Sequence, residues 1–262
     1  MSELVSLRCP NCGAPIQAGD ITCDYCGSAL YVGQAAEVAL PALADAQKLA
    51  STMRNRITLN PYDGDAYYQL GLACFTLQLY DEAENSFRQA QRFLPGNALA
   101  HYFTGLATLH ASEREILALA GFRLHQIQIE FERALQINPN LKQAHSYLEL
   151  IEGLRARDLG DYAAAIDPLK QATNELPGLA LAWKVLAACF FQIGQYEDAI
   201  HAAQHTLELH PTDEESAYLL GAAHFRLGHE AQMERFAHKV AELRGDSARW
   251  EAIAREYRGH FE

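Results

Sequence analysis

The stretch from Gly64 to Pro95 reads GDAYYQLGLACFTLQLYDEAENSFRQAQRFLP, which predicts two amphipathic helices joined by a short turn. Prolines that close similar stretches recur along the chain, at separations of 34, 44, 38 and 34 residues: Pro61, Pro95, Pro139, Pro177 and Pro211. A recurring period near 34 residues is typical of a helical solenoid, in which each unit packs against its neighbours.

The sizes of the residues inside this stretch follow a regular pattern. Small residues at Gly71, Ala83 and Ala90 let two helices approach closely, and large residues fill the gaps between them: Tyr67, Leu70, Tyr80 and Phe87. The stretch resembles a tetratricopeptide repeat at its signature positions, except that Cys74 stands where an aromatic residue is usual. The resemblance implies a mainly α, right-handed solenoid of about five repeats with capping helices, and a role in protein–protein interaction.

The repeat pattern divides the chain into segments. We expect a zinc ribbon at residues 1–33, a linker and opening helix at 34–63, the solenoid at 64–245 and a C-terminal capping helix at 246–262. The repeats are expected near residues 64–95, 98–139, 142–177, 180–211 and 214–245.

Two repeats are longer than the others. The third carries four extra residues, which the register assigns to a longer first helix near residues 141–157. The second carries ten, and we expect its second helix to begin near Ser112 and run to Ile137, so that it overhangs its neighbours with four apolar residues: Ile116, Leu117, Leu119 and Phe122. This overhang packs against the insertion of repeat three, or docks the zinc ribbon, a second copy of the chain as a homodimer, or a partner.

The N-terminal segment LRCPNCGAPIQAGDITCDYCGSALYVG contains two CxxC pairs, Cys9 with Cys12 and Cys23 with Cys26. Four thiolates from two tight turns are a complete tetrahedral set for structural Zn²⁺. The alternatives are a redox dithiol or two disulfides. A thioredoxin-type CxxC occurs singly, however, so the paired motif favours zinc. The segment resembles a small β zinc ribbon, and a closed four-cysteine site is structural rather than catalytic.

Composition excludes several classes of partner. The formal charge of −12 disfavours binding to nucleic acid, and no run of about 18 apolar residues predicts insertion into a membrane. The N-terminus lacks the basic and then apolar build of a signal peptide, and the two remaining cysteines stand alone inside predicted helices. We therefore expect a cytoplasmic protein in a reducing compartment.

No catalytic motif is visible in the sequence. His201 and His205 are four residues apart and could share a metal, but the repeat register places them on an outer helix, where an exposed, incidental pair is expected. His101 and His145 occupy a register position usually held by Trp or Tyr, so we expect them to be partly buried packing residues. We predict that the chain is not an enzyme.

The remaining candidate site is the concave face, which the first helix of each repeat lines. Its candidate partner-binding residues are aromatic and apolar with one cation: Tyr68, Leu72, Phe75, Tyr102, Leu106, Lys184, Phe191, Tyr218 and Phe225. Such a groove suits a helix or an extended segment with apolar anchors. Chaperone-binding members of this family hold the C-terminal carboxylate of a partner with lysine and asparagine at fixed inner positions. Tyr68 and Leu72 stand at these positions in repeat one, so the resemblance does not extend to that carboxylate clamp.

These patterns predict a non-catalytic scaffold or adaptor that binds a peptide or helix of a partner protein in the concave groove, with structural zinc in its ribbon. The alternative is a regulatory or assembly subunit of an enzyme or membrane-associated complex, with the ribbon as its docking element. The sequence does not identify the partner, the pathway or the oligomeric state.

Overall fold

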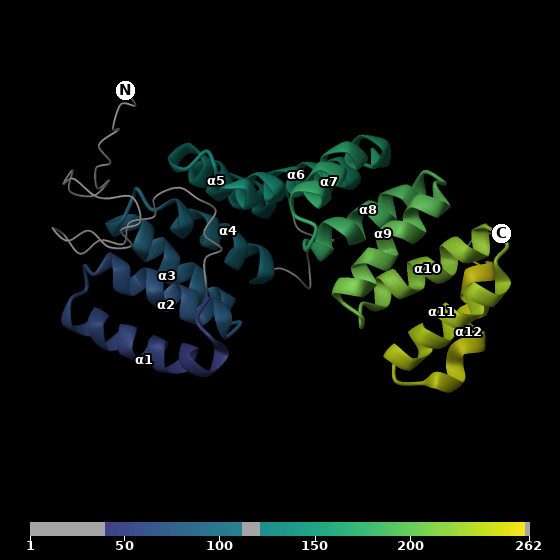
Figure 1. Cartoon of the computed structure of the whole chain (residues 1–262), viewed down its shortest axis with the longest axis horizontal. Coiled ribbons are helices and arrows are strands. Elements are labelled where there is room, and N and C mark those ends of the chain that lie inside the picture. The colour runs from purple at the N-terminus through teal and green to yellow at the C-terminus, as the bar shows by residue number, and fades with distance from the viewer. Residues whose placement is uncertain (1–39, 112–120, 260–262) are drawn as a thin grey trace, which may run out of the picture. The chain divides into compact units, whose positions relative to one another are not determined.

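The computed structural model describes residues 40–111 and 121–259, except for the side chains of Phe122 and Ser247 (Figure 1). The described residues form helices joined by short turns. The chain divides into two compact units, residues 1–144 and 145–262, and each is considered by itself.

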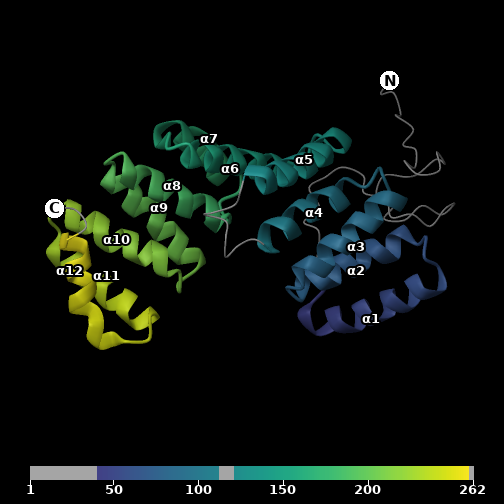
Figure 2. The same cartoon turned by 180° about the vertical axis from the view of Figure 1, so that it is seen from behind.

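The first unit holds five described helices, and successive helices pack side by side (Figure 1, Figure 2). Their bounds are α1 Leu43–Leu59, α2 Gly64–Thr76, α3 Tyr80–Phe93, α4 Ala98–Ala111 and α5 Gly121–Ile137. Helix α1 lies within the range expected for the opening helix, and α5 ends at the residue that the sequence predicts. The expected start of the second helix of repeat two, at residues 112–120, lies outside the described residues.

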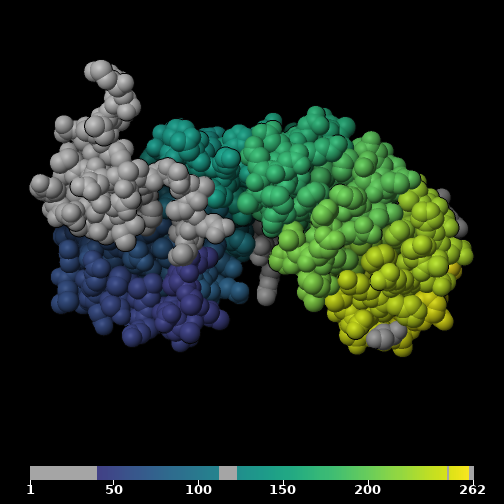
Figure 3. All heavy atoms as spheres, viewed as in Figure 1, coloured from purple at the N-terminus to yellow at the C-terminus, as the bar shows by residue number. Residues whose placement is uncertain are grey.

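The second unit contains the remaining helices, of which α6 begins three residues before the boundary between the units. Their bounds are α6 Lys142–Asp158, α7 Tyr162–Glu175, α8 Ala180–Gln192, α9 Tyr196–Leu209, α10 Glu214–Arg226, α11 Glu230–Leu243, the 3₁₀ turn η2 Ser247–Arg249 and α12 Trp250–Gly259. Helix α6 has 17 residues whereas α8 and α10 have 13, so the four extra residues of repeat three do lengthen its first helix. In the space-filling view α8 to α12 form one continuous body, coloured green to yellow (Figure 3).

Aspartate caps begin several helices. Asp63, Asp161 and Asp213 each accept a hydrogen bond from the backbone N–H three residues ahead, at 2.9, 3.0 and 2.9 Å. Each carboxylate satisfies one N–H that has no partner within the helix, and its charge is favourable at the positive end of the helix. These caps therefore fix where α2, α7 and α10 start.

Glycines in the first helices allow close packing. A Cβ added at Gly71 would lie 2.5 Å from Cε1 of Phe87, and one added at Gly105 would lie 2.9 Å from Cε1 of Phe131. Gly153 faces Leu169 in the same way. Because no side chain can occupy these positions, the large residue of the next helix sits directly against the helix backbone, as the size pattern predicts.

The fifth repeat departs from this scheme. Gly221 faces Tyr257 of α12, which is 36 residues away (221 to 257), whereas Phe87 is 16 residues from Gly71 (71 to 87). Position 237, which is 16 residues after Gly221, is a buried alanine. The closing helix therefore supplies the large residue that the second helix of this repeat lacks. Within the described residues, the C-terminal capping helix expected at 246–262 begins as the 3₁₀ turn η2 and continues as α12.

The turn between the two helices of a repeat contains a residue whose backbone is in the left-handed conformation. Gly160, Gly194 and Gly228 have φ of +79°, +81° and +73°, and Gln78 occupies the corresponding position of the first repeat with φ +59°. A residue with a Cβ pays a steric cost in this conformation that glycine avoids.

Candidate functional site

Three aromatic residues of the predicted concave surface lie in the second unit. Phe191 on α8 and Tyr218 and Phe225 on α10 are each partly buried, and all three pack on the core formed by α10, α11 and α12. Phe191 makes an edge contact with Tyr196, with ring centroids 5.4 Å apart. These rings are held in place by the core and still present part of their surface to solvent.

Lys184 is the cation of this surface and is held by α10. Its Nζ donates to Oδ1 of Asp213 at 2.9 Å and forms an ion pair with Glu215. Burial alone would lower the pKa of Lys184, but its hydrogen bonds with Glu215 and Asp213 outweigh this, and the pKa lies above its ordinary value. Lys184 therefore remains charged, and it joins α8 to the start of α10.

Asp213 has two roles at this point. One oxygen accepts from Lys184 and the other from the backbone N–H of Ser216. Burial alone would raise the pKa of Asp213, but the hydrogen bonds from Ser216 and Lys184 hold it below its ordinary value. The carboxylate is thus both the cap of α10 and the anchor of the lysine.

The predicted groove residues of the first unit have a different environment. Tyr68, Leu72 and Leu106 are only 2%, 4% and 5% exposed, whereas Phe75 and Tyr102 are partly exposed. The ring of Tyr68 packs against Phe87, with centroids 5.9 Å apart. Three of the five candidates in this unit are thus packed inside it and present almost no surface to a partner.

Two sets of predicted residues fall where the structure gives no side-chain account. Cys9, Cys12, Cys23 and Cys26 lie outside the described residues, as do Ile116, Leu117 and Leu119. Phe122 belongs to α5, but its side chain is among those left aside. The zinc ligands and the overhang therefore remain predictions.

The other two cysteines, Cys74 and Cys189, are free and buried. Burial raises the pKa of each thiol to about 11, and in Cys74 the nearby carboxylate of Glu82 contributes to the increase. Thiols with such a pKa are weak nucleophiles near neutral pH, so neither suits covalent catalysis.

Three of the histidines considered in the sequence are partly or fully exposed: His145, His201 and His205. Nδ1 of His145 lies 3.0 Å from Oε2 of Glu175, and the side chain of His145 is 43% exposed. His201 and His205 have ring centroids 4.8 Å apart, and His205 stacks on Trp183 at 4.5 Å. Within residues 40–111 and 121–259, no group of three His, Cys, Asp or Glu side chains is placed to hold a metal ion.

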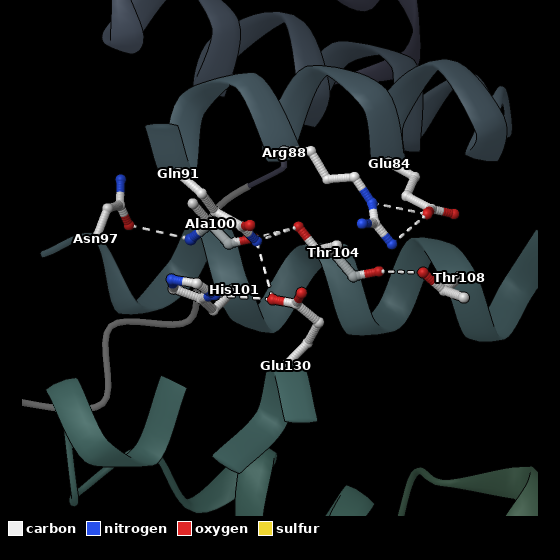
Figure 4. A network of polar contacts seen from close by, with 9 residues as sticks. All are labelled: Glu84, Arg88, Gln91, Asn97, Ala100, His101, Thr104, Thr108 and Glu130. Carbon is white, nitrogen blue, oxygen red and sulfur yellow. Dashed lines mark hydrogen bonds and ion pairs between the residues drawn. The ribbon is translucent and has the colours of Figure 1, made fainter. Parts of the chain in front are cut away.

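A buried polar network in the first unit has no clear signal in the sequence (Figure 4). His101 on α4 and Glu130 on α5 are 7% and 8% exposed, and Nδ1 of His101 lies 2.8 Å from Oε2 of Glu130. Nε2 of Gln91 on α3 donates to the same carboxylate at 3.0 Å and to Oγ1 of Thr104 at 2.7 Å. The network joins three helices and satisfies a carboxylate that would be costly to bury alone.

None of the described helices has the length and apolar character that a membrane crossing requires.

Comparisons with known proteins agree with this architecture. Family models of the tetratricopeptide repeat match residues 64–93 and 156–223, and a model of a zinc-ribbon domain matches residues 6–30. The four paired cysteines lie in the last of these ranges. A comparison with curated protein sequences gives no significant match.

Solved structures share the fold at low sequence identity. The structure of PilF from Pseudomonas aeruginosa aligns with a TM-score of 0.59 and 13% identity, over 81% of this chain and 90% of that chain. PilW, described as a widely conserved type IV pilus biogenesis factor, aligns with a TM-score of 0.56 and 18% identity, over 80% and 91%. At such identities the likeness shows the fold alone. The matched ranges show tetratricopeptide repeats and a zinc-ribbon domain in this chain, and the fold of the described helices agrees with the repeats.

Proposed function

We propose that this chain is a non-catalytic scaffold or adaptor that binds an apolar helix or extended segment of a partner protein on α8 and α10. The tetratricopeptide repeat fold suggests protein–protein interaction as the general role. The observation that supports this surface is the row of partly exposed rings, Phe191, Tyr218 and Phe225, which the core of the second unit holds in place.

The chemistry of this surface defines the segment that it would take. Rings that are already fixed by packing lose little conformational entropy when a partner covers them, so aromatic anchors are efficient binding residues. Lys184 is bound to Asp213 and Glu215, so this cation is largely neutralised. Apolar contact, rather than capture of a carboxylate, is therefore the main interaction expected here.

Selection of peptides on the full-length protein tests this proposal. Peptides from a random displayed library would be synthesised, and their affinities measured for the wild type, for Phe191→Ala with Phe225→Ala, and for the control Trp183→Ala, whose ring stacks on His205 of α9. Because central aromatic residues carry most of an interface's binding energy, we expect the double variant to lose tenfold or more in affinity and the control to lose little.

A second variant separates binding from folding. Phe191→Leu with Phe225→Leu keeps most of the apolar volume, so its circular dichroism and thermal unfolding should match the wild type. Peptides that bind both double variants as tightly as the wild type would refute this surface as the binding site.

We further propose that Cys9, Cys12, Cys23 and Cys26 hold one structural Zn²⁺. Four thiolates fill every coordination position, and a module of this size has too little apolar material to fold without the metal. We expect about one zinc per chain in the purified protein, measured by elemental analysis, and loss of that zinc in Cys9→Ser and in Cys23→Ser with the helical circular dichroism almost unchanged. Zinc retained in both variants would exclude this ligand set.

A further inference from the structure

We propose a second interaction site, independent of the apolar surface on α8 and α10: a basic pocket in the first unit that takes an acidic segment of a partner protein. The pocket has a volume of about 430 Å³ and lies between α3 and α5, with the start of α4 at its edge. Arg88 and Arg92 line it from α3, and Arg133 lines it from α5.

Charge distinguishes this pocket from the rest of the chain. The chain carries a formal charge of −12, yet three guanidinium groups line one pocket and no Asp or Glu is among its described lining residues. Arginine presents several N–H donors in a planar fork that matches a carboxylate. The pocket therefore attracts anions on a molecule that as a whole repels them.

The three arginines differ in whether a residue of the protein already binds and neutralises the guanidinium group. Arg88 forms an ion pair with Glu84 at 2.9 Å, and Arg92 donates to Oε1 of Gln89 at 3.3 Å, a contact with a neutral group. Arg133 makes no hydrogen bond or ion pair within the part of the chain that the structure describes. Arg92 and Arg133 thus retain donors and full charge for a ligand.

The buried network fixes the base of the pocket. His101 and Gln91 both line it, and both are bound to Oε2 of Glu130 (Figure 4). The carboxylate of Glu130 is thereby occupied from within the fold and is not itself among the lining groups. The network holds the wall rigid, which lowers the cost of ordering the site when a ligand binds.

The size and the walls of the pocket favour a peptide over a free phosphate. The volume lies within the range of sites for drug-sized ligands and is far larger than a single phosphate group. Part of the lining is apolar, including Pro95 and Ile137, and Ile137 is 39% exposed. An acidic segment that places carboxylates on Arg92 and Arg133 and an apolar side chain on Ile137 uses both kinds of wall.

The test uses the full-length protein and a fluorescein-labelled peptide of alternating glutamate and leucine, with binding followed by fluorescence anisotropy. Arg92→Gln with Arg133→Gln removes two charges from the pocket. Arg235→Gln with Arg258→Gln removes two charges from exposed arginines of α11 and α12 and is the matched control. We expect the pocket variant to lose on the order of tenfold or more in affinity and the control to lose less than about threefold.

Three results would overturn the proposal. Equal losses in the two double variants would mean that only the overall charge matters. Absence of peptide binding to the wild type at millimolar concentration would show that the pocket does not take an acidic segment. Saturable binding of inorganic phosphate that is lost in the pocket variant, without peptide binding, would make the site an anion site of another kind. The altered arginines are exposed, so unchanged circular dichroism is expected for all variants.

Discussion

Replacing Tyr257 by phenylalanine should stabilise the C-terminal end of the chain. The side chain of Tyr257 is 0% exposed, and its hydroxyl has no hydrogen-bond partner among the described residues. Burial, and then the neighbouring Tyr218, raise the pKa of the Tyr257 hydroxyl far above its ordinary value. The oxygen has thus lost its water without gaining a partner in the protein.

The expected gain follows from two opposing effects. Burying a hydroxyl without a hydrogen bond costs about 1–3 kcal/mol in proteins. Removing the oxygen leaves a void of about one water, roughly 10–15 Å³, which costs about 0.3 kcal/mol at roughly 24 cal/mol per Å³. The unfolding free energy should therefore rise by about 1 kcal/mol or more.

Trp250 offers a local probe for this effect, because it packs on the same core as Tyr257 and stacks on His238 at 4.2 Å. The chain has two tryptophans, so a Trp183→Phe background makes Trp250 the only indole reporter. In urea, a gain of about 1 kcal/mol moves the midpoint up by several tenths of a molar. A local probe is needed because repeat arrays need not unfold as one unit.

The control is Tyr62→Phe, since Tyr62 is 77% exposed and its hydroxyl reaches water in both states. No change is expected there. A loss of stability in Tyr257→Phe would refute the reasoning, because it would mean that the buried hydroxyl is satisfied.

Further predictions address the packing, a turn and a cap. Gly71→Ala should lower the unfolding free energy by about 1–2 kcal/mol in chemical denaturation, because the clash with buried Phe87 outweighs the better helix propensity of alanine, whereas Gly96→Ala, with open space around it, should change little. Gln78→Gly should raise the midpoint of thermal unfolding, since it removes an αL cost of about 1 kcal/mol, and a lower midpoint would contradict this. Asp213→Ala should cost about 1–3 kcal/mol through loss of the cap and of the anchor for Lys184. Because the pKa of Asp213 lies below its ordinary value, this contribution is present above about pH 4 and is lost as the pH falls through the folded pKa, so the wild type and the variant should converge in acid.

The fold could be predicted from the sequence because it depends on local signals that recur in each repeat. The proline spacing sets the repeat, and Gly71 and Gly105 mark where large residues must enter. The longer first helix of repeat three also followed from register alone, since the second helix kept its spacing. These features involve residues within one repeat, where the pattern of sizes is direct.

The burial of individual side chains and their contacts with residues far away in the sequence could not be predicted from the repeat pattern. Tyr68 occupies a position that faces the groove in the repeat scheme, but the structure buries it beside Phe87, and periodicity alone does not distinguish an inward position from a half-exposed one. His101 pairs with Glu130, 29 residues later, and His145 pairs with Glu175, 30 residues later. The two glutamates occupy different positions in their repeats, so no motif signals either pair. The basic pocket combines α3 and α5, which only the fold brings together.

The packing of glycine against a large residue also indicates where this chain can be lengthened. Phe131 lies 26 residues after Gly105 (105 to 131), ten more than the interval between Gly71 and Phe87, yet each ring rests on the helix backbone in the same manner. The fit between the two helices therefore does not depend on the number of residues that connect them, and extra connecting residues cost little closure entropy. A change in the number of residues between Gly105 and Phe131 should accordingly leave this contact of ring and glycine in place.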